Sequence, residues 1–366
     1  MKIGIDIRPL ETDTITGIGE YIKNLILGLS KKGFRCILYH TKKYPNIPSE
    51  KNIETRLIKS QNKYFFEQVN LLKELSLNPP DIYHATSNMG IPLLHKGISV
   101  LTVHDLIPLT KKNYFNKSAF PFLSKKTFLA STKIATHKAK RIIAISKTTK
   151  KNIIEKLDIK KNKIRVIYPG ASIPQNPNFK IIDKLNLKKK QFILNNGGID
   201  KRKNLERLIK SVDIAKKVFP NIKLVITGEN IPQRKGLEEL AQKIGIKENI
   251  IFTGFIDRES LWALIQESEF VCYPSEDEGF GFPIIEAVES SKAIILSRIS
   301  IFKELAKDFA LFVNPNSPLS IARGIIRLKK DKNLKKFLIK KSLTKKGLFS
   351  WEKTINKTIS LYKEII

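Results

Sequence analysis

The stretch SEDEGFGFPIIEAV, residues 275–288, places Glu278 and Glu286 eight positions apart, with two glycines, two phenylalanines and a proline between them. It follows the apolar run EFVCYP, which predicts a β-strand, and Pro283 is suited to the first turn of a helix. Residues 278–282 are therefore expected to form the loop between strand and helix. Such a loop lies at the carboxyl end of a parallel strand, where open α/β sheets bind ligands.

The composition of this loop suits a ligand that carries both hydroxyl groups and negative charge. Gly279 and Gly281 allow close approach of the backbone or a positive φ, and the N–H groups of the following helix can bind an anion. Glu278 in the loop and Glu286 about one turn into the helix can each accept hydrogen bonds from two hydroxyls. The alternative is a loop acid and a first-turn acid that only stabilise the helix dipole.

The same alternation of short β-branched runs and longer amphipathic stretches continues along the whole chain, which predicts parallel sheets joined by helical crossovers. A helix from about Glu20 to Ser30, ending near Gly33, follows the first strand. Strands are expected at residues 3–7, 34–39, 82–84, 99–103, 141–144 and 164–167, and again at 191–194, 223–227, 250–253, 269–273, 293–297 and 310–313. The fold class is α/β, with two doubly wound halves.

Prolines and asparagines interrupt both periodicities in YPGASIPQNPNF, residues 168–179, as in an interdomain linker. The expected organisation is a first domain over residues 1–170, a linker over 171–185, a second domain over 186–347 and a terminal helix over 348–366. Ser350 is the expected cap of that helix, with Glu352 in its first turn.

The chain is strongly basic, with 67 Lys and Arg against 34 Asp and Glu and a formal net charge of +33. Such a surface attracts nucleic acid, an anionic membrane or phosphorylated small molecules. The lysines are spread along the sequence, so the charge can equally reflect a lysine-rich composition.

Cellular location is inferred from what the sequence lacks. No apolar run approaches the roughly 18 residues of a membrane-spanning helix, and the N-terminus reads as a strand rather than a secretory leader. We expect a cytoplasmic protein that touches the membrane only at its surface. Cys36 and Cys272 lie in strand-like runs, which favours two buried thiols over a disulfide or a metal pair.

The motif EGFGFPIIE resembles the E-x7-E signature of retaining glycosyltransferase family 4. Members of this family have the GT-B fold, two facing Rossmann-like doubly wound domains with a C-terminal helix that crosses back to the first domain. The resemblance implies that Glu278 contacts hydroxyls of the transferred sugar and Glu286 the ribose of the nucleotide. Residues 279–282, Gly279, Phe280, Gly281 and Phe282, would bind the donor.

Two segments of the first half extend the resemblance. MKIGIDIRPL followed by TGIGEYIKNLI is similar to the family's first strand and glycine-rich loop, in which Gly17 and Gly19, expected to precede the first helix, would lie beside a diphosphate. VHDLIP, with His104 and Asp105, resembles its acceptor-side loop. A neutral imidazole of His104 could donate to the sugar or orient the acceptor, and a general base is not expected there.

Two segments of the second half agree with it as well. NNGGIDKRKNLERLI resembles the family's strand, glycine turn and helix start, so Arg202 and Lys203 are expected at the domain cleft, where they would stabilise the departing nucleoside diphosphate. GFID resembles the loop that borders the base-binding pocket, which adds Phe255 to the substrate-binding residues.

The chain departs from the family pattern after Glu286, where Ser291 and Ala293 stand in place of the usual glycine and proline. The acidic run at residues 276–278 is not expected to bind a metal, and no His, Cys or carboxylate cluster has metal-ligand spacing. We therefore expect no metal and no cofactor other than a nucleotide diphosphate sugar as donor substrate.

These observations predict a retaining, metal-independent hexosyltransferase. The DIRPL, GIGEYIKNL and VHDLIP segments look most like bacterial mannosyltransferases of surface polysaccharide synthesis, which favours GDP-mannose; a UDP-hexose or UDP-N-acetylhexosamine is the alternative. The acceptor would be a glycan, free or on a lipid diphosphate, at the inner face of the cytoplasmic membrane. Nucleic acid is not expected as a partner.

Two other hypotheses remain. A non-catalytic polyanion-binding protein would need an open basic face with interleaved aromatic residues. A nucleotide-sugar epimerase or phosphorylase on the same fold would hold the donor but lack a glycan acceptor.

Overall fold

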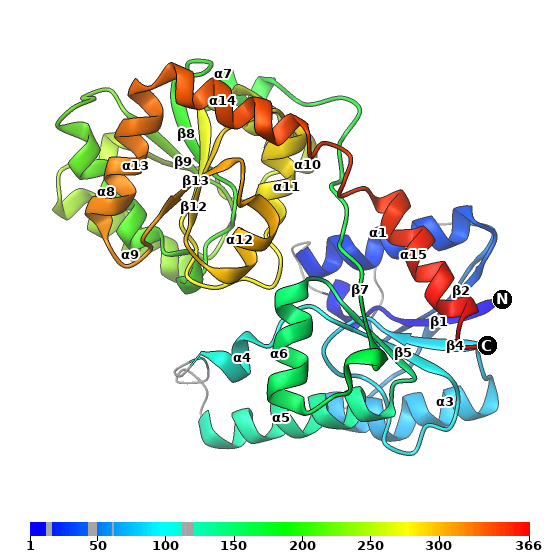
Figure 1. The fold of residues 1–366 in the computed structure, drawn as a ribbon. Helices are drawn as coiled ribbons and strands as arrows, with labels where there is room; N and C mark the ends of the chain where they lie inside the picture. The colour runs from blue at the N-terminus through cyan, green and yellow to red at the C-terminus, as the bar shows by residue number, and fades with distance from the viewer. Residues whose placement is uncertain (12–16, 43–49, 61, 112–113, 115–120) are drawn as a thin grey trace. The chain divides into compact units, whose positions relative to one another are not determined.

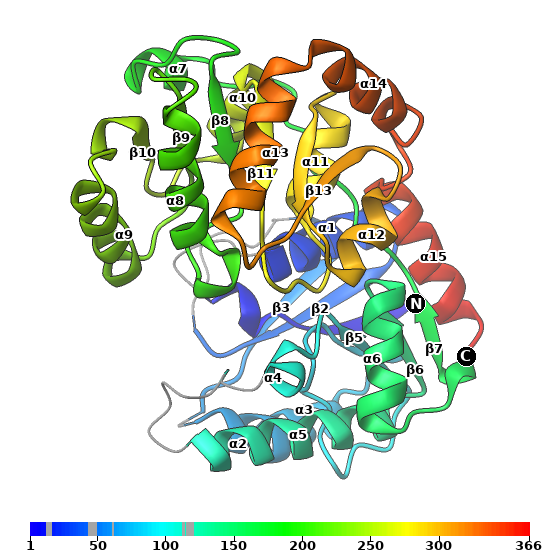
Figure 2. The same ribbon diagram turned by 60° about the vertical axis from the view of Figure 1, so that its left-hand side comes forward.

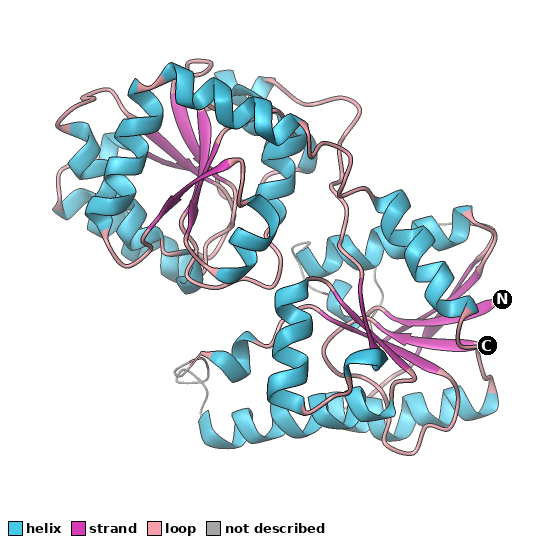
Figure 3. Ribbon diagram, viewed as in Figure 1, coloured by secondary structure: helices cyan, strands magenta, loops and turns pink. Residues whose placement is uncertain are grey.

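The computed structural model describes residues 1–11, 17–42, 50–60, 62–111, 114 and 121–366. This part of the chain divides into two compact units (Figure 1). Unit 1 contains Met1–Gly170 and Phe349–Ile366, and unit 2 contains Ala171–Leu348. In each unit a parallel sheet lies between layers of helices (Figure 3), the doubly wound arrangement that the alternating pattern predicts.

Unit 1 is built on a seven-stranded parallel sheet of order β3-β2-β1-β4-β5-β6-β7. Its strands are β1 (Lys2–Asp6), β2 (Arg35–His40), β3 (Ile53–Leu57), β4 (Ile82–Ala85), β5 (Ser99–Val103), β6 (Arg141–Ala144) and β7 (Ile164–Val166). Its helices are η1 (Arg8–Leu10), α1 (Gly17–Lys31), α2 (Lys63–Phe65), η2 (Phe66–Asn70), α3 (Leu71–Leu77), α4 (Ile107–Thr110), α5 (Pro121–Lys138), α6 (Lys147–Leu157), η3 (Lys161–Lys163) and α15 (Trp351–Lys363). One apolar cluster joins the sheet to α1 and α15, and a second joins it to α3, α5 and α6.

Strand β3 is absent from the expected strands. Its sequence, IETRL, alternates with charged residues and stays partly exposed, because it forms the edge of the sheet. Parallel pairing with β2 defines the strand, and Glu54 forms ion pairs with Arg35 of β2 and with Arg56. None of its residues is fully buried, so it lacks the apolar run by which buried parallel strands are recognised.

The first helix begins earlier than expected. We expected Gly17 and Gly19 in a loop before it, and that is wrong, since α1 starts at Gly17 and both glycines lie in its first turn. Tyr21 and Ile22 begin a buried apolar stripe along this helix, and tertiary packing of such a stripe outweighs the low helix propensity of glycine. The helix ends as expected, with Gly33 at φ 83°.

The C-terminal helix α15 belongs to unit 1 and packs beside α1 (Figure 2), as the resemblance implied. Ser350 caps it by accepting a hydrogen bond from the Lys353 N–H at 3.3 Å, which confirms the expected cap. The two helices approach closely at Gly28, where a Cβ would lie 2.4 Å from Cγ1 of Ile355. A similar contact occurs at Gly170, whose Cβ would lie 2.2 Å from the backbone nitrogen of Trp351.

Unit 2 is built on a six-stranded parallel sheet of order β10-β9-β8-β11-β12-β13. Its strands are β8 (Phe192–Asn195), β9 (Lys223–Ile226), β10 (Ile250–Phe252), β11 (Phe270–Tyr273), β12 (Ile294–Ser297) and β13 (Ala310–Val313), all of them expected. Its helices are α7 (Lys180–Lys184), η4 (Lys201–Lys203), α8 (Leu205–Lys216), α9 (Ile231–Lys243), η5 (Lys247–Asn249), α10 (Arg258–Glu267), α11 (Phe282–Glu289), α12 (Ser300–Ala306), α13 (Pro318–Lys330) and α14 (Lys332–Leu343). Helices α8 and α13 pack together on one face of this sheet (Figure 1).

Two further expectations from the sequence can be compared with the fold. Cys36 and Cys272 are both free and buried, as predicted. None of the described helices has the length and apolar character needed to cross a membrane.

Candidate active site

The carboxyl edge of the unit 2 sheet carries a buried carboxylate surrounded by donors. Strand β11 ends at Tyr273, and the loop that follows places Glu278 where its side chain is 8% exposed. Oε1 of Glu278 accepts hydrogen bonds from Lys203 Nζ at 2.6 Å, from Ser275 Oγ at 2.7 Å and from the hydroxyl of Tyr273. Oε2 forms an ion pair with Arg202. The structure thus brings together three of the predicted site residues.

A short 3-10 turn brings the two basic side chains to this carboxylate. Asp200 caps η4 by accepting from the Arg202 N–H at 2.9 Å, and Asn204 ends the turn in the left-handed region at φ 62°. The amide of Asn204 then donates to the carbonyls of Pro274 at 3.0 Å and Pro315 at 2.7 Å. Asn204 thereby fixes three segments of the edge to one another.

Electrostatics keep Glu278 ionised at neutral pH. Burial alone would raise its pKa, but the charges of Lys203 and Arg202 outweigh burial and lower the pKa to about 2. Burial in turn lowers the pKa of Lys203 more than the carboxylate raises it. The side chain of Arg202 remains 31% exposed, so this cluster presents one guanidinium towards the solvent.

The second acid of the motif has partners of its own. Glu286 in α11 is 2% exposed and forms an ion pair with Arg258 Nη1 at 2.8 Å, and its other oxygen accepts from Asn196 Nδ2 at 2.6 Å. Arg258 also donates to the carbonyl of Ser172, at 2.9 Å from Nη2. Oδ1 of Asn196 is buried and has no hydrogen-bond partner among the described residues.

The loop between the two acids has the backbone geometry that its glycines suggested. Gly281 adopts φ 112° as the N-cap of α11, with Pro283 in the first turn of that helix. Phe280 is buried and packs edge-on against Phe282 at 5.6 Å, while Gly279 is partly exposed.

Phe255 lies elsewhere in unit 2. It sits in the loop between β10 and α10, and its side chain is 58% exposed.

The carboxyl edge of the unit 1 sheet combines a buried ion network with neutral groups. Asp6 at the end of β1 pairs with Arg8 at 2.6 Å, and Arg8 also pairs with Glu67 at 2.9 Å. His104 follows β5, and its Nε2 lies 2.8 Å from the carbonyl oxygen of Thr86. Asn88 accepts from the His104 N–H at 2.9 Å and donates to the Asp105 carbonyl at 2.8 Å. The carboxylate of Asp105 accepts from the Ile107 N–H at 3.0 Å, which fixes the start of α4.

Burial lowers the pKa of His104 to about 4, so the imidazole is neutral at pH 7. A carbonyl oxygen can only accept a hydrogen bond, so Nε2 carries the proton and donates it to Thr86. The N–H group that was expected to donate to a sugar is thus already used, and Nδ1 can only accept. The ring of Tyr21, one turn after Gly17 and Gly19 on α1, packs edge-on against this imidazole at 5.1 Å.

Two family models match the chain, one on each unit. The model of "Glycosyltransferase Family 4" matches residues 15–173, and that of "Glycosyl transferases group 1" matches residues 177–344. The chain belongs to glycosyltransferase family 4. The bacterial mannosyltransferases that it resembles in sequence are also among its curated relatives.

Three relatives illustrate the range of similarity. The "Uncharacterized glycosyltransferase MJ1607" of Methanocaldococcus jannaschii is 27% identical over 63% of this chain, and the "O-antigen chain mannosyltransferase RfbU" of Salmonella typhimurium is 29% identical over 64%. The chain spans 61% of the length of each. The "O-antigen chain mannosyltransferase B" of Escherichia coli is 24% identical over 99% of this chain and 100% of its own.

Solved structures share the GT-B fold of this glycosyltransferase. Sucrose-phosphate synthase from Thermosynechococcus elongatus has a TM-score of 0.82 at 19% identity, covering 99% of this chain and 98% of its own. Anabaena HepE in complex with UDP and glucose has a TM-score of 0.80 at 15% identity, covering 100% of both chains. WaaG, "a glycosyltransferase involved in lipopolysaccharide biosynthesis", has a TM-score of 0.80 at 14% identity, covering 98% of this chain and 99% of its own.

Several residues of the candidate site were missed from sequence. Tyr273 and Ser275 at the end of β11 were read only as a strand end, although polar residues at that edge in front of an acid are a usable signal. Arg258 had no local signal, because one arginine among 67 basic residues is indistinguishable before folding, and nothing next to Asn196 in the sequence marks it as a partner of Glu286.

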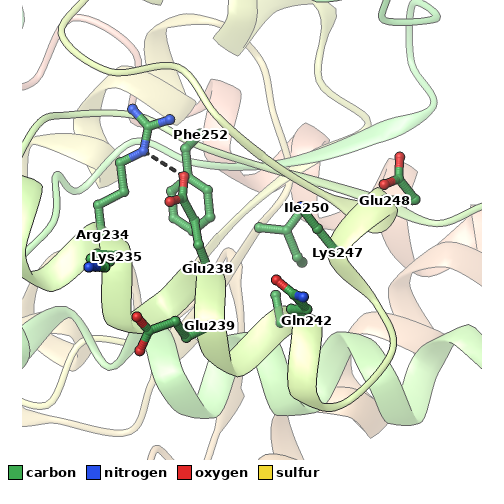
Figure 4. Close-up of a pocket in the computed structure, with 10 residues that line it drawn as sticks. Arg234, Lys235, Glu238, Glu239, Gln242, Lys247, Glu248, Ile250 and Phe252 are labelled. Atoms are coloured by element: carbon green, nitrogen blue, oxygen red, sulfur yellow. Dashed lines mark hydrogen bonds and ion pairs between the residues drawn. The ribbon is translucent and has the colours of Figure 1, made fainter.

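A separate surface pocket of about 610 Å³ lies between α9 and β10 of unit 2 (Figure 4). Both signs of charge line it, and Arg234 pairs with Glu238 at 2.8 Å beside Phe252. It contains none of the predicted site residues. The described residues also include no group of three or more His, Cys, Asp or Glu side chains arranged to hold a metal ion.

Proposed function

We propose that the chain is a retaining hexosyltransferase that moves mannose from GDP-mannose to a hydroxyl of a glycan and forms an α-glycosidic bond. The preferred acceptor is a lipid-linked glycan of surface polysaccharide synthesis. The observation that carries this proposal is the cluster of Arg202, Lys203 and Glu278 at the carboxyl edge of the unit 2 sheet. That edge is where doubly wound sheets bind nucleotides.

In this proposal Arg202 and Lys203 stabilise the nucleoside diphosphate as it leaves. The guanidinium of Arg202 has five N–H donors and is partly exposed, so it can contact diphosphate oxygens while it keeps its ion pair with Glu278. Lys203 is buried and adds positive charge from behind. Cations held in place before the reaction stabilise developing negative charge without reorganisation, so no metal is needed.

Glu278 would bind the sugar through Oε2, which among the described residues accepts from Arg202 alone while Oε1 accepts from three donors, and it also fixes both basic side chains. Glu286 would bind the ribose, the backbone of Gly279–Phe282 would approach the donor, and Phe255 would border the base. The carboxylate oxygens of Glu286 accept from Arg258 and Asn196, which holds them in one orientation.

In unit 1, His104 would orient the acceptor. Its neutral ring offers Nδ1 as an acceptor for a hydroxyl, which suits a retaining reaction in which the nucleophilic hydroxyl enters on the side that the diphosphate leaves. Asp105 would keep this loop in register through its bond to Ile107. Gly17, at the exposed start of α1, and Gly19, which is buried, would bring backbone N–H groups near the diphosphate.

The choice of donor rests on relatives. The O-antigen mannosyltransferases RfbU and mannosyltransferase B favour mannose. Structural neighbours solved with UDP, glucose or UDP-glucose make a UDP-hexose or UDP-N-acetylhexosamine the second candidate.

Association with the inner face of the cytoplasmic membrane is part of the proposal. Exposed apolar side chains of unit 1 include Tyr64, Phe65 and Val69 around η2 and Leu93 and Leu94 in the loop after β4. The N–H of Leu93 donates to Gln68 of η2 at 2.9 Å, so the two groups adjoin. Exposed lysines 73 and 96 lie in the same segments, and apolar side chains flanked by lysines suit an anionic leaflet.

The central test is a transfer assay with labelled GDP-mannose, UDP-glucose and UDP-N-acetylglucosamine, with and without lipid-linked glycans from bacterial membranes. We expect transfer from GDP-mannose in EDTA, an α-configured product by NMR, and loss of transfer in Arg202→Ala. Lys201→Ala, which removes the exposed basic neighbour, is the matched control and should keep activity. Intact donors in every mixture would exclude a transferase, and a β-linked product would exclude retention.

Membrane association is tested separately by sedimentation with vesicles of phosphatidylglycerol or of phosphatidylcholine. We expect binding to the anionic vesicles alone, and weaker binding of Phe65→Glu and Leu94→Glu. Ile231→Glu, which changes an exposed apolar residue of unit 2, is the control. Equal sedimentation with both lipids, or with none, would reject the anionic leaflet as a partner.

A further inference from the structure

A buried chain of hydrogen bonds runs through unit 1 from the C-terminal helix to α1. The hydroxyl of Tyr362 in α15 lies 2.6 Å from Nδ1 of His84, and Nε2 of His84 lies 2.8 Å from Oγ1 of Thr102. The hydroxyl of Tyr21 in α1 lies 3.1 Å from the same Oγ1. All four side chains are fully buried, so water does not compete for these bonds.

The proton positions along this chain follow from its ends. Burial lowers the pKa of His84 to about 3, so its ring is neutral and has one donor and one acceptor nitrogen. Within the described residues, His84 is the one hydrogen-bond partner of the Tyr362 hydroxyl, which must therefore donate to Nδ1. Nε2 then carries the proton and donates to Thr102, so the first two bonds run in one direction, and in the third either hydroxyl can donate.

The far end of the chain is the aromatic neighbour of His104. The Tyr21 ring lies 5.1 Å from the His104 ring in an edge-on arrangement and 6.1 Å from the ring of Trp351, the first residue of α15. Helix α15 therefore holds Tyr21 twice, at the ring through Trp351 and at the hydroxyl through the chain from Tyr362. The tight crossing at Gly28 and Ile355 fixes α15 against α1 between these two points.

We propose that the C-terminal helix positions the His104 imidazole through Tyr21, and that Tyr21, Thr102, His84 and Tyr362 are positioning residues of the candidate active site. The effect of this positioning on catalysis rests on the proposed function, because His104 has a role in transfer only if the chain is a transferase. Without the Tyr362 hydroxyl, the buried Nδ1 of His84 loses its donor and the imidazole is no longer held in one orientation. Thr102 and Tyr21 then lose their fixed partners.

The direct test is the NMR spectrum of full-length protein labelled with ¹⁵N-histidine, in which the ring nitrogens report tautomer and hydrogen bonding. The chain has five histidines, and the spectrum of His104→Gln assigns the signal of interest. We expect Tyr362→Phe and Tyr21→Phe to shift the His104 ring signals. Tyr39→Phe is the matched control, since Tyr39 is a buried tyrosine of unit 1 whose hydroxyl has no partner among the described residues.

Steady-state kinetics test the consequence for transfer. We expect kcat to fall about fivefold in Tyr362→Phe and Tyr21→Phe, the worth of one buried hydrogen bond, and KM for the donor to stay nearly constant. Tyr39→Phe should leave both constants unchanged. If Tyr362→Phe does not fold, Thr102→Val breaks the chain at its middle with a side chain of almost the same shape.

The two readouts separate failure of this inference from failure of the proposed function. If the wild-type protein transfers no sugar, the function is wrong, and the His104 spectra still decide whether α15 positions the imidazole. If the protein is active but the His104 signals and kcat are the same in Tyr362→Phe, Tyr21→Phe and Tyr39→Phe, the positioning role is rejected. A lower unfolding midpoint in Tyr362→Phe with unchanged His104 signals would likewise reject it, because the chain would then be only structural.

Discussion

The carboxyl edges of the two sheets have the same architecture, but the predicted site residues include a buried carboxylate in unit 2 and a buried neutral imidazole in unit 1. In unit 2 a buried carboxylate, Glu278, faces two basic side chains, and its charge is needed to keep Arg202 and Lys203 in place. In unit 1 the corresponding edge carries the ion network of Asp6, Arg8 and Glu67. It also holds His104 and His84, which burial keeps uncharged and which a carbonyl and two hydroxyls satisfy. In the proposed function the charged cluster of unit 2 is suited to a diphosphate and the neutral imidazole of unit 1 to a hydroxyl.

The largest expected effect comes from breaking the charged edge. Glu278→Ala leaves Lys203 buried without a carboxylate, which should lower the free energy of unfolding of unit 2 by about 3–5 kcal/mol. Urea denaturation followed by reaction of Cys272 with a thiol reagent measures this.

Glu276→Ala provides the control for that measurement. Glu276 pairs with Arg207 at 2.6 Å, but both side chains are partly exposed. Its loss should cost less than about 1 kcal/mol. Equal costs for the two variants would contradict the assignment of Glu278 as the anchor of a buried cluster.

Acid should separate the two edges. The pKa values of His104 and His84 are lowered to about 4 and about 3, so the stability from their burial is complete above pH 6.5 and is lost as the pH falls towards these values. The pKa of Glu278 is lowered from 4.5 to about 2, so its contribution is retained down to about pH 4.5. Between pH 6.5 and 4.5 the free energy of unfolding of unit 1 should therefore fall before that of unit 2. Each of the two histidines should lower it by about 1.4 kcal/mol per pH unit in this range.

The measurement uses urea midpoints of each unit at pH 7, 6 and 5. A pyridyl disulfide that reacts in acid reports opening of unit 1 at Cys36 and of unit 2 at Cys272. A decline that begins in unit 2 over this range would contradict the assignment of His104 and His84 as buried neutral groups.

A smaller effect should follow from loosening the unit 2 edge without touching a charge. Asn204→Ala removes hydrogen bonds to two carbonyls and replaces asparagine, which tolerates φ 62°, by alanine, which adopts it less readily, so we expect a loss of about 2–3 kcal/mol. Asn204→Gly keeps the backbone conformation at lower strain and should cost less. If both variants match wild type in urea, the three segments are not fixed by this amide.

The smallest expected effect concerns the two cysteine thiols, whose reactivity in the folded protein should be close to zero. Burial raises the pKa of Cys36 to about 12 and that of Cys272 further still, so neither thiol is available as a thiolate. Mass spectrometry should find no alkylation by iodoacetamide in the folded protein and two alkylated cysteines in urea. Modification of one cysteine alone under native conditions would identify the unit that opens more often.

The sequence predicts well those elements that are set by residues next to one another along the chain. Buried strands such as β5 and β11 are continuous apolar runs, and Ser350 and Gly33 mark helix ends by their own chemistry. Strand β3 and the start of α1 depend on tertiary contacts, with β2 in one case and the apolar stripe beginning at Tyr21 in the other. Local propensity therefore misplaced them.

The candidate site shows the same division. Glu278, Arg202 and Lys203 were found because a family motif marks them at fixed spacing, and the structure does bring them together. Tyr273, Arg258 and Asn196 were missed because their roles arise from pairing between distant segments. The hydrogen bonds that link Tyr362 to Tyr21 join residues from four elements, and no spacing in the sequence indicates them.

The contact at Gly170 has a consequence for how the chain can be cut and rejoined. Gly170 ends the first part of unit 1, and Trp351, two residues after the second part begins, lies against it with no room for a side chain. Unit 2 is thus one continuous insertion whose two junctions with unit 1 are neighbours, an arrangement in which domain insertion is well tolerated. Residues 171–348 form a cassette that can be expressed alone or exchanged with that of a relative, while a short linker closes unit 1 at small entropic cost.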